Sequence, residues 1–600
     1  MSVGAATSHG IIRAGVDSVM EPSGGLHQHG DVSLLIVGHC LLDRAQRDAA
    51  FAVAVSDGDH ARVAAWPGAY SAIVIRGRAV TAYADVSEQF PLYYSRRGEE
   101  ILVAGDAAAL AVAHDRGIDP LAAAAEIACP SVLPAWQTRS PYAGVSRVPG
   151  GAVLHATPGS VRVRHERVPY PVAGRSLADG AALLRDALLD AVRERCAGRQ
   201  VSADFSGGLD STSVALLAAA CARPPVTAVA YHQPLAPAGD LPYAIRYAAL
   251  EPKLSLRVVT GTERTLPFAG LAGHCGIRPG QDHGADPHPG WLTAERSLAR
   301  LAAAQRSGAT LHLTGEGGDA ILLPAPSYLG SLVRHGRPLT LLRHSSGYAR
   351  LRQAATADLV GQAVRLAGTG PGRALSGLAA ELNGAGRRAG RWMDFIAWWP
   401  PAGPAAQWLT AGARRQLADH IADPATARAL PDGTSPADLA ALTDVRRSGD
   451  AQRQLRRLAA PLGLEVHAPF LDDAVIRAAL SVPAHVRADP RAYKPLLGAA
   501  LDGLLPAEVL TRRTKGDYTA EDYAGVRAAL PALRTLLRDS RLADLGVIEP
   551  AAVLSAVDRM AAGVTVPLGP LNTVLATEAW LHGTDWRHGS QEPRLGVSAG

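Results

Sequence analysis

The sequence of 600 residues has few cysteines, no long apolar run and no strong excess of either charge. Its five cysteines are odd in number and form no CxxC pair, which argues against a disulfide framework or a structural zinc site and predicts a reducing compartment. The most apolar stretch, residues 214–220, is only as long as a segment of a core helix, so no membrane span is expected. A net charge of +5 is too dilute over this length to favour nucleic acid as a partner.

The first residues also lack the apolar core of a signal peptide, and we expect a cytoplasmic protein. The composition, 48% hydrophobic and 19% charged, is that of a folded soluble protein, and the chain is long enough for at least two domains. Basic residues recur at helical spacing at Arg453, Arg456 and Arg457, which predicts a solvated helix face.

The chain is organised around residues 206–211, which lie between a strand pattern over 201–205 and a helix pattern over 212–221. The two adjacent glycines of this segment can fold backbone N–H groups around an anion, and the following helix directs its unpaired N–H groups to the same point. Phosphate is the ligand expected at such a site, and Asp210 is suited to hold a magnesium ion against it. No lysine follows the glycines, so this is not the GxxxxGK[ST] phosphate loop. The alternative is a tight turn with Asp210 as a helix cap.

This strand–SGGLDS–helix segment resembles the pyrophosphate loop of the asparagine synthetase family and of the wider group of ATP pyrophosphatases. The resemblance implies that ATP is cleaved between its α and β phosphates with the help of Mg²⁺. A carboxylate becomes an acyl-AMP, pyrophosphate leaves, and an amine captures the acyl group as an amide. The nucleotide-binding residues implied by the loop are Ser206, Gly207, Gly208, Leu209, Asp210 and Ser211.

A second motif, residues 314–319, follows a predicted strand over 310–313 and resembles the GEGxDE segment of asparagine synthetases. By that match Gly315 contacts the nucleotide, Asp319 is the second carboxylate on magnesium and Glu316 lies close to the acyl-adenylate. The chain departs from the pattern at Ala320, where the family usually has an acid, and no FGGY follows. The adenylation chemistry is expected to be retained, but the pocket that recognises aspartate is not.

Three further stretches extend the resemblance. Val229 lies in a predicted strand over 226–231, where the backbone of a parallel strand often meets adenine. Lys515 follows Lys494-Pro495 and ends the phrase 512–515, where the family keeps a catalytic lysine; a cation there stabilises departing pyrophosphate and the developing oxyanion. The alternative for Lys515 is a surface lysine. The EVHAPFLD segment, residues 465–472, predicts a structural turn at the edge of the site.

The N-terminal part shows no periodicity before about Gly30 and then short β patterns up to about residue 168. Residues 66–70, 85–94 and 145–150 resemble the glutaminase-like domain of asparagine synthetases. In that family a nucleophilic cysteine follows the initiator Met, where its own amine acts as base. Here Ser2 stands in that position and no cysteine precedes Cys40. We therefore expect a retained scaffold that releases no ammonia, so that the amine comes from another donor.

The predicted fold class is α/β. Residues 1–170 are expected to form a glutaminase-like (Ntn-type) β-sandwich domain, residues 171–590 an ATP-pyrophosphatase domain with a parallel sheet and helical additions, and residues 591–600 a tail. Two clusters have open interpretations. The loop 271–291, with Asp282, His283, Asp286 and His288, is more typical of an irregular loop than of a metal site. The tryptophans of the helical region are interpreted as packing or as an aromatic wall for a peptide; they are Trp392, Trp398, Trp399 and Trp408.

Family members that lack the glutaminase nucleophile include β-lactam and carbapenam synthetases and the cyclases of lasso peptides, in which the amine belongs to the substrate itself. The extra length of the helical region favours a lasso peptide cyclase. It would adenylate the side-chain carboxylate of an Asp or Glu of a precursor (core) peptide, and the peptide's N-terminal amine would close the macrolactam, with Glu316 accepting its proton. The expected partners are that peptide, a leader peptidase and a leader-recognition protein, with no nucleic acid and no membrane. The alternatives are a β-lactam-type synthetase, an asparagine synthetase-like amidotransferase using free ammonia, and a catalytically silent scaffold.

Overall fold

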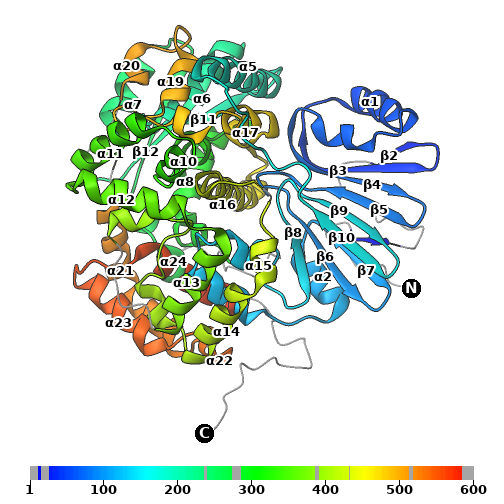
Figure 1. The fold of residues 1–600 in the computed structure, drawn as a ribbon. Helices are drawn as coiled ribbons and strands as arrows, with labels where there is room; N and C mark the ends of the chain where they lie inside the picture. The colour runs from blue at the N-terminus through cyan, green and yellow to red at the C-terminus, as the bar shows by residue number, and fades with distance from the viewer. Residues whose placement is uncertain are drawn as a thin grey trace.

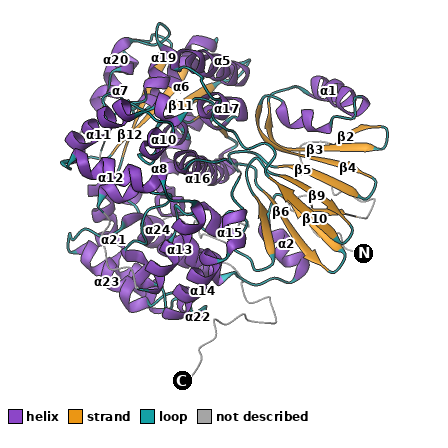
Figure 2. Ribbon diagram, in the orientation of Figure 1, coloured by secondary structure: helices purple, strands orange, loops and turns teal. Residues whose placement is uncertain are grey.

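The computed structural model describes residues 11–14, 26–235, 239–272, 286–384, 391–431, 433–512, 516 and 518–583. A β-sandwich forms the N-terminal part, and the remainder is a parallel sheet surrounded by helices (Figure 1). Strands are concentrated in the sandwich, whereas helices dominate the rest of the chain (Figure 2). This arrangement confirms the predicted α/β fold class.

The sandwich consists of two antiparallel sheets. The first has the strand order β1-β7-β6-β8 and the second the order β10-β9-β5-β4-β3-β2. Their bounds are β1 (Ile11–Ala14), β2 (Leu26–His29), β3 (Val32–Cys40), β4 (Gly68–Arg76), β5 (Ala79–Tyr83), β6 (Leu92–Arg97), β7 (Glu100–Ala104), β8 (Val145–Val148), β9 (Val153–Thr157) and β10 (Ser160–Arg164). Two of these strands, β1 and β2, fall in the segment that the sequence predicts as irregular, so that expectation is wrong for residues 11–14 and 26–29.

Alternation along each strand builds four layers in this part. Leu35 of β3 faces the space between the sheets, where it joins Val103 and Leu154 in one core. Its neighbours on the strand face the other way and pack against α1 (Arg44–Ser56) through Phe51. On the outer side of the smaller sheet, α2 (Ala107–His114) packs through Leu110. The order of layers is therefore helix, six-stranded sheet, four-stranded sheet, helix.

The second part is built on a five-stranded sheet with the order β13-β12-β11-β14-β15, in which every pair of neighbouring strands is parallel. The bounds are β11 (Val201–Asp204), β12 (Val226–His232), β13 (Leu254–Thr260), β14 (Leu311–Leu313) and β15 (Glu465–His467). The chain runs outward from β11 to β13 and then returns to the other side of β11 with β14. This reversal places a topological switch point between β11 and β14, where open α/β sheets bind ligands.

Helices cover both faces of this sheet and extend beyond it. The helices that precede or alternate with its strands are α3 (Pro120–Ala128), α4 (Leu133–Trp136), α5 (Leu177–Cys196), α6 (Leu209–Cys221), α7 (Leu241–Ala248), α8 (Ala294–Arg306) and α9 (Gly318–Leu322). Those between β14 and β15 continue with α10 (Tyr328–Arg334), α11 (Pro338–Arg352), α12 (Thr356–Ala367), α13 (Pro371–Asn383), α14 (Ala411–Ala422), α15 (Pro424–Arg428) and α16 (Pro436–Ala459). After β15 come α17 (Asp473–Leu480), α18 (Ala484–Arg487), α19 (Pro495–Leu501), α20 (Ala507–Leu510), α21 (Thr519–Arg538), α22 (Arg541–Asp544), α23 (Pro550–Ala561) and α24 (Leu568–Gly583).

The two parts share buried surface. The predicted division at residue 170 lies between β10 and α5, but the preceding helices α3 and α4 pack into the core of the C-terminal part through Ile127 and Trp136. Helix α16 lies between the sandwich and helices α8, α10 and α12 in the view of Figure 1. The two parts therefore meet over a continuous interior rather than through a linker.

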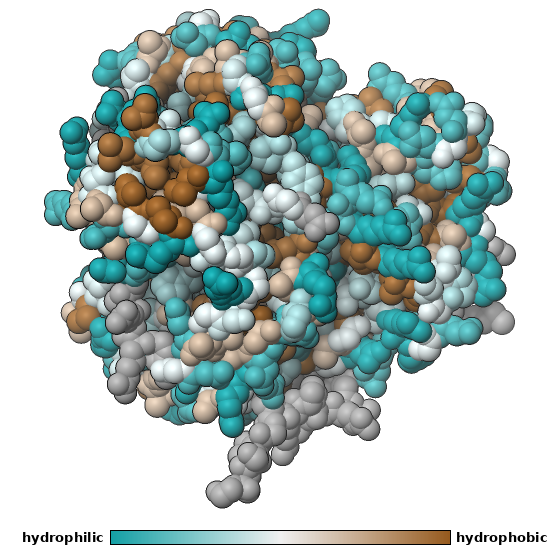
Figure 3. All heavy atoms as spheres, viewed as in Figure 1, coloured by the Kyte–Doolittle hydropathy of each residue, from teal (hydrophilic) through white to brown (hydrophobic). Residues whose placement is uncertain are grey.

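The outer face of the helical region carries exposed apolar side chains. Figure 3 shows them gathered at the upper left of the molecule, where α11 and α12 lie. The exposed large apolar residues of these two helices are Leu339, Leu342, Leu351 and Val364. None of the helices in the described ranges is long and apolar enough to cross a bilayer.

Candidate active site

The two glycine-containing motifs meet at the switch point of the parallel sheet. Residues 206–211 follow β11 and residues 314–319 follow its neighbour β14. Together they line a cavity of about 520 Å³, a size typical of small-molecule sites. The predicted site residues among its lining are Ser206, Gly208, Leu209, Asp210, Ser211, Val229, Gly315, Glu316 and Asp319.

The first motif forms a tight turn into α6. Gly207 has a φ of +76°, which a residue with a side chain rarely adopts. The turn is closed by the Ser206 and Ser211 hydroxyls, 2.9 Å apart, and by the Gly208 N–H, which donates to the Ser206 hydroxyl over 3.2 Å. Helix α6 begins after Gly208 and has no side-chain cap, so the alternative in which Asp210 caps the helix is wrong. Its first-turn N–H groups remain directed at the cavity.

A lysine joins the two predicted magnesium ligands. The Lys494 ammonium forms ion pairs with Asp210 and, over 2.6 Å, with Asp319. The Lys494 side chain is fully buried, that of Asp210 is 18% exposed and that of Asp319 is 47% exposed. Burial acts to lower the pKa of Lys494, but the charges of Asp210 and Asp319 raise it above its usual value, so the side chain stays charged.

Missing side chains allow the two motifs to approach this closely. A Cβ at Gly315 would lie 2.6 Å from the backbone nitrogen of Ser211, and a Cβ at Gly318 would overlap the carboxyl group of Asp210. The second motif turns at Gly317, whose φ is +91°. The two aspartates therefore face one point because glycine occupies the positions between them.

Glu316 is held inside the same cavity. Ser448 of α16 lines the same cavity. Burial and the nearby charges of Asp319 and Asp210 raise the pKa of Glu316, and the polar groups of Ser448 and the Gly317 N–H only partly oppose them. Beside it, the Thr314 hydroxyl donates over 3.0 Å to Gln452, also on α16.

The other end of the cavity lies beside β12. Val229 sits within β12 rather than at its end, and its carbonyl oxygen accepts a hydrogen bond of 2.8 Å from the Phe205 N–H. Contact between this backbone and adenine stays a prediction. Nearby, Arg300 and His312 contact the Asp204 carboxylate over 2.9 and 3.2 Å. Burial acts to raise the pKa of Asp204, but these two partners outweigh it and lower the pKa to about 2.

Lys515 lies outside the described residues, and its predicted role stays a prediction. The described residues on either side of it are Arg512 and Gly516. Arg512 pairs with Asp240 and stacks on Tyr243 at 4.0 Å, and its guanidinium lies close to Gly207. The Gly516 N–H donates to the same Asp240 carboxylate over 3.0 Å. Both residues are therefore held at Asp240, which lines the cavity.

Asp210 and Asp319 fit a magnesium ion. Their oxygens converge on one point and are the hard ligands that Mg²⁺ prefers. No group of three or more His, Cys, Asp or Glu residues able to hold a metal occurs in the described part of the chain. A Mg²⁺ ion held by these two carboxylates would take its remaining ligands from water and phosphate.

The predicted loop residues that the structure describes belong to the domain interface. Asp286 accepts hydrogen bonds from Tyr93 over 2.8 Å and from Arg453 over 2.7 Å, and His288 accepts one from the Gly290 N–H. Asp282 and His283 lie outside the described residues. Burial lowers the pKa of His288 to about 4, as expected for an imidazole that stays neutral.

The prediction of a solvated arginine face is wrong. Arg453 is 7% exposed and pairs with Asp286 and Asp450, while Arg456 covers the Phe90 ring at 3.9 Å. These charges face the sandwich rather than water. Arginines recur at the same helical spacing on a solvated face and on a face that pairs with another domain, because the spacing does not show what lies opposite the helix.

The tryptophans of the helical region are mostly packed. Trp398, Trp399 and Trp408 are buried, and the Trp398 indole N–H donates to the Thr369 carbonyl over 2.7 Å. Trp398 and Trp399 also line a second cavity of about 620 Å³ between α12 and α13. Packing is therefore confirmed for these three residues, and the peptide-wall interpretation stays a prediction for the second cavity.

Sequence reasoning missed three contributors to the site, which are Lys494, Ser448 and Gln452. The sequence holds one signal for Lys494, which is a cation directly before Pro495 and an apolar helix. In the structure its φ of +48° lies in the left-handed region, which a residue with a side chain rarely adopts. Ser448 and Gln452 lie four residues apart on α16, but only the fold shows that this face meets the two motifs.

The asparagine synthase family model matches residues 183–582. No curated protein matches the chain. A solved structure described as glutamine phosphoribosylpyrophosphate amidotransferase from B. subtilis complexed with ADP and GMP is 12% identical, with a TM-score of 0.18; the match covers 49% of this chain and 64% of that one. A second, described as the allosteric regulatory enzyme of purine biosynthesis, is 10% identical with a TM-score of 0.18, and the match covers 54% of this chain and 61% of that one.

The matches span less than two thirds of either of those two chains, and a likeness at this TM-score supports no conclusion about this protein. The family model, in contrast, covers more than half of the chain and includes both motifs at the switch point. The chain belongs to the asparagine synthase family.

Proposed function

We propose that this chain is a lasso peptide macrolactam cyclase, which uses ATP and Mg²⁺ to join an Asp or Glu side chain of a precursor peptide to that peptide's own N-terminal amine. ATP-dependent amide formation is the chemistry of the family to which the chain belongs. The observation that carries the proposal is the convergence of Asp210, Asp319 and Lys494 at the mouth of the phosphate turn. The ammonium suits the negative charge of a triphosphate, and the two carboxylates suit the cation that accompanies it.

The direction of substrate entry is supported by exposure at the site. The Lys494 side chain is fully buried, whereas that of Asp319 is 47% exposed. The carboxylate and the amine are therefore expected to approach from the Asp319 side, with the phosphates on the side of the turn. An amine that reaches the acyl carbon from solvent needs no internal ammonia path, as suits an amine carried by the substrate.

The thiols of the N-terminal part also support an amine from the substrate. Among its described residues, Cys40 ends β3 of the sandwich, and Cys129 follows α3 and packs in the core of the C-terminal part. Burial raises the pKa of Cys40, and it raises the pKa of Cys129 to about 12. Neither thiol is held as the reactive thiolate that attack on glutamine would need.

In the proposed reaction, an oxygen of the peptide carboxylate attacks the α phosphorus of ATP. The bond to the bridging oxygen of the β phosphate breaks, and pyrophosphate leaves with that electron pair. The N–H groups of the turn at 206–211 and the Lys494 ammonium hold the phosphate charge. Bound Mg²⁺ would neutralise further negative charge beside Asp210 and Asp319.

In the second step, the neutral amine attacks the acyl carbon of the mixed anhydride, and AMP leaves. The proton lost by the nitrogen is transferred to Glu316, whose raised pKa makes its carboxylate a stronger base than that of an ordinary glutamate. The products are the cyclic amide, AMP and pyrophosphate. The leader peptidase and leader-recognition protein act earlier in this proposal, because they supply a peptide with a free N-terminal amine.

The test is incubation with ATP, Mg²⁺ and a leader-free peptide that bears Asp or Glu several residues from its N-terminus. A cyclase gives a product lighter by one water, together with AMP and pyrophosphate in equal amounts. The same peptide with an acetylated N-terminus serves as the control, because it can be adenylated but cannot close. Linear peptide in every reaction, or an amidated linear product that appears only with added ammonia, would contradict the proposal.

A further inference from the structure

Two faces of helix α16 make different contacts, one with the cavity and one with the sandwich. Ser448, Ala451, Gln452 and Leu455 recur at helical spacing and line the nucleotide cavity. A second set of residues, shifted by two positions, lies on the opposite side of the helix and meets the sandwich. That set consists of Arg446, Gly449, Asp450, Arg453 and Arg456.

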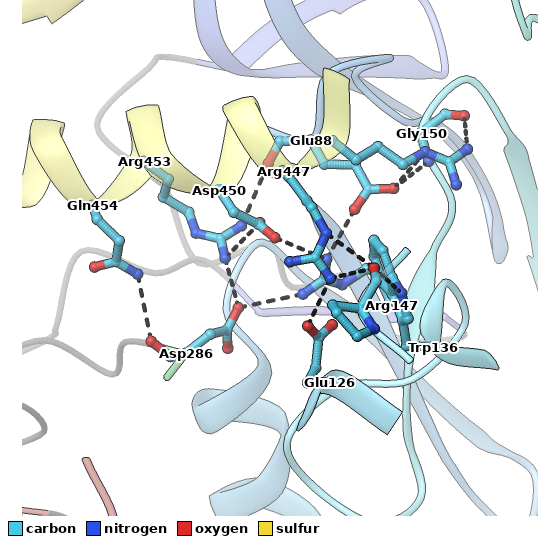
Figure 4. A network of polar contacts seen from close by, with 12 residues as sticks. Glu88, Glu126, Trp136, Arg147, Gly150, Asp286, Arg447, Asp450, Arg453 and Gln454 are labelled. Carbon is cyan, nitrogen blue, oxygen red and sulfur yellow. Dashed lines mark hydrogen bonds and ion pairs between the residues drawn. The ribbon is translucent and has the colours of Figure 1, made fainter. Parts of the chain in front are cut away.

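A short turn of the sandwich, residues 87–89, meets this second face. Two further contacts lie beside it: the Gly150 carbonyl accepts from Arg446 over 2.9 Å, and Arg147 lies 3.7 Å from Asp450. A Cβ at Gly449 would overlap the carbonyl oxygen of Ser87, so the turn rests directly on the backbone of α16. The guanidinium groups of Arg453 and Arg456 donate to the carbonyl oxygens of Glu88 and Gln89 over 3.4 and 3.2 Å. Figure 4 shows the side chains of α16 projecting toward this turn and toward Asp286.

Glu88 is the centre of the contact. Its side chain is fully buried, and one carboxylate oxygen accepts from the Gly150 N–H over 2.7 Å and lies 3.2 Å from the Arg446 Nε. The other oxygen accepts from Arg147 over 3.0 Å. Glu88 also has a φ of +57°, which is unfavourable for a residue with a side chain and persists only where the surroundings fix it.

The opposite face of α16 determines the position of the second motif. Ser448 and Glu316 line the same cavity, and Gln452 accepts from the Thr314 hydroxyl over 3.0 Å. The amide of Gln452 also donates to the Val466 carbonyl of β15 over 3.2 Å. A rotation or slide of α16 would therefore move Glu316 and Thr314. The phosphate turn is built on β11 and α6, and it would keep its own geometry.

We propose that Glu88, in the sandwich, is a positioning residue for the adenylation site: it fixes α16 through Arg446 and thereby holds Ser448 and Gln452 against the second motif. The role of the sandwich is then mechanical support of the synthetase site across the domain interface. This inference rests on the proposed ATP-dependent chemistry for its kinetic consequences, but its structural part can be tested without any turnover.

The first experiment is hydrogen–deuterium exchange on the intact chain without ligands. Glu88→Gln keeps the shape of the side chain but removes the charge that pairs with Arg446 and Arg147. Arg147 keeps its ion pairs with Asp286 and Asp450, whereas the buried Arg446 loses the carboxylate that it pairs with. We expect faster exchange in peptides covering residues 440–456 and 314–319, with no change in residues 206–211. Arg167→Gln is the matched control, since it breaks another ion pair between the two parts, Arg167 to Asp473 at 3.3 Å, away from α16. Equal exchange in Glu88→Gln and Arg167→Gln would overturn the inference.

The second experiment measures pyrophosphate release with a substrate peptide. We expect Glu88→Gln to lower kcat about tenfold while the KM for ATP changes little, because the phosphate turn does not depend on α16. Ser448→Ala is expected to lower kcat similarly, and the double variant to be no worse than Ser448→Ala alone, since both act on Glu316 through one helix. Effects that multiply in the double variant would overturn the positioning role.

Gly449→Ala alters the same contact from the helix side without removing a charge, and it is expected to reproduce the exchange pattern of Glu88→Gln. It keeps the inference testable if Glu88→Gln does not fold. Failure of the proposed function would be recognised separately: the unmodified chain would then release no pyrophosphate with any peptide, while the exchange difference between Glu88→Gln and Arg167→Gln would remain.

Discussion

His39 of the sandwich and His467 at the end of β15 stack face to face across the domain interface, with ring centroids 3.6 Å apart and planes inclined by 12°. The Arg195 Nε–H donates to His467 Nδ1 over 3.0 Å, so this nitrogen carries no proton. Burial lowers the pKa of both imidazoles well below its usual value, and the neighbouring charges of Arg195 and Arg456 lower it further. The interface is therefore built for two neutral rings.

Acid is expected to loosen this interface. Because the pKa of both rings is depressed in the folded chain, their contribution to stability is complete above the unfolded pKa of about 6.5 and is lost as the pH falls below it. Each ring contributes a slope of up to about 1.4 kcal/mol per pH unit in that range. Arg195, Arg199 and Arg456 face the pair and oppose protonation, while Glu465 alone favours it. The measurement is the free energy of unfolding between pH 7.5 and 5.

His39→Phe provides the comparison, because a phenyl ring can stack on His467 without binding a proton. We expect the variant to lose less stability than the unmodified chain over the same pH range. Phe90, which meets His39 edge to face at 4.8 Å, should still pack against the new ring. Parallel pH dependences in the two proteins would show that the stack does not titrate with folding.

Lys494→Met is expected to reduce pyrophosphate release at least a hundredfold, because it removes the ammonium that joins Asp210 to Asp319. Loss of one partner from a buried ion pair typically costs about 3–5 kcal/mol, so the variant should also unfold at lower temperature. Mg²⁺ should then stabilise the variant more than the unmodified chain, since it no longer competes with an ammonium for the two carboxylates. An equal rise of Tm with Mg²⁺ in both proteins would contradict this assignment of the cation site.

Gly318→Ala tests the close approach of the two motifs. The added methyl group would overlap the Asp210 carboxyl group and push it from its position opposite Asp319. We expect at least a tenfold loss of ATP-dependent activity. Gly498→Ala is the matched control on the nearby α19, where no atom lies within 4 Å of the new carbon. It should keep full activity and gain about 0.5–1 kcal/mol of stability.

Glu316→Gln separates the two chemical steps. Glutamine keeps the shape of the side chain and can still meet Ser448, but it cannot accept a proton from the attacking amine. Adenylation, followed as exchange of labelled pyrophosphate into ATP, should remain within a few-fold of normal. Ring closure should fall by about 10²–10⁴-fold, the range typical of a lost general base. Normal ring closure by the variant would remove Glu316 from this role.

Local sequence signals were sufficient to find the two motifs that meet at the switch point. The turn at 206–211 and the motif at 314–319 each follow a short apolar strand, and their glycines and carboxylates have few other uses in that setting. The strands β11 and β14 are adjacent, and this adjacency brings the two predicted magnesium ligands together. The general fold followed from the same local patterns, with alternating strands before residue 168 and strand–helix repeats after it.

The contributions of distant segments could not be predicted. Lys494 reaches Asp210 from 284 positions along the chain, and its burial is visible only once the fold is known. Arg453 and Arg456 were predicted to face solvent because the sequence does not show that Glu88 and Asp286 lie opposite them. Long-range pairing of charges depends on the arrangement of domains, which local periodicity does not encode.

The order of strands in the parallel sheet separates two properties along the chain. Between β14, which leads into the second motif, and β15 at the edge of the sheet, the chain leaves the sheet for the whole helical region from α9 to α16. The lining of the cavity at the switch point includes Asp319 at one end of this excursion and residues of α16 at the other, and none of the described residues between them. Substitutions on that intervening stretch are therefore expected to leave the lining of the cavity in place.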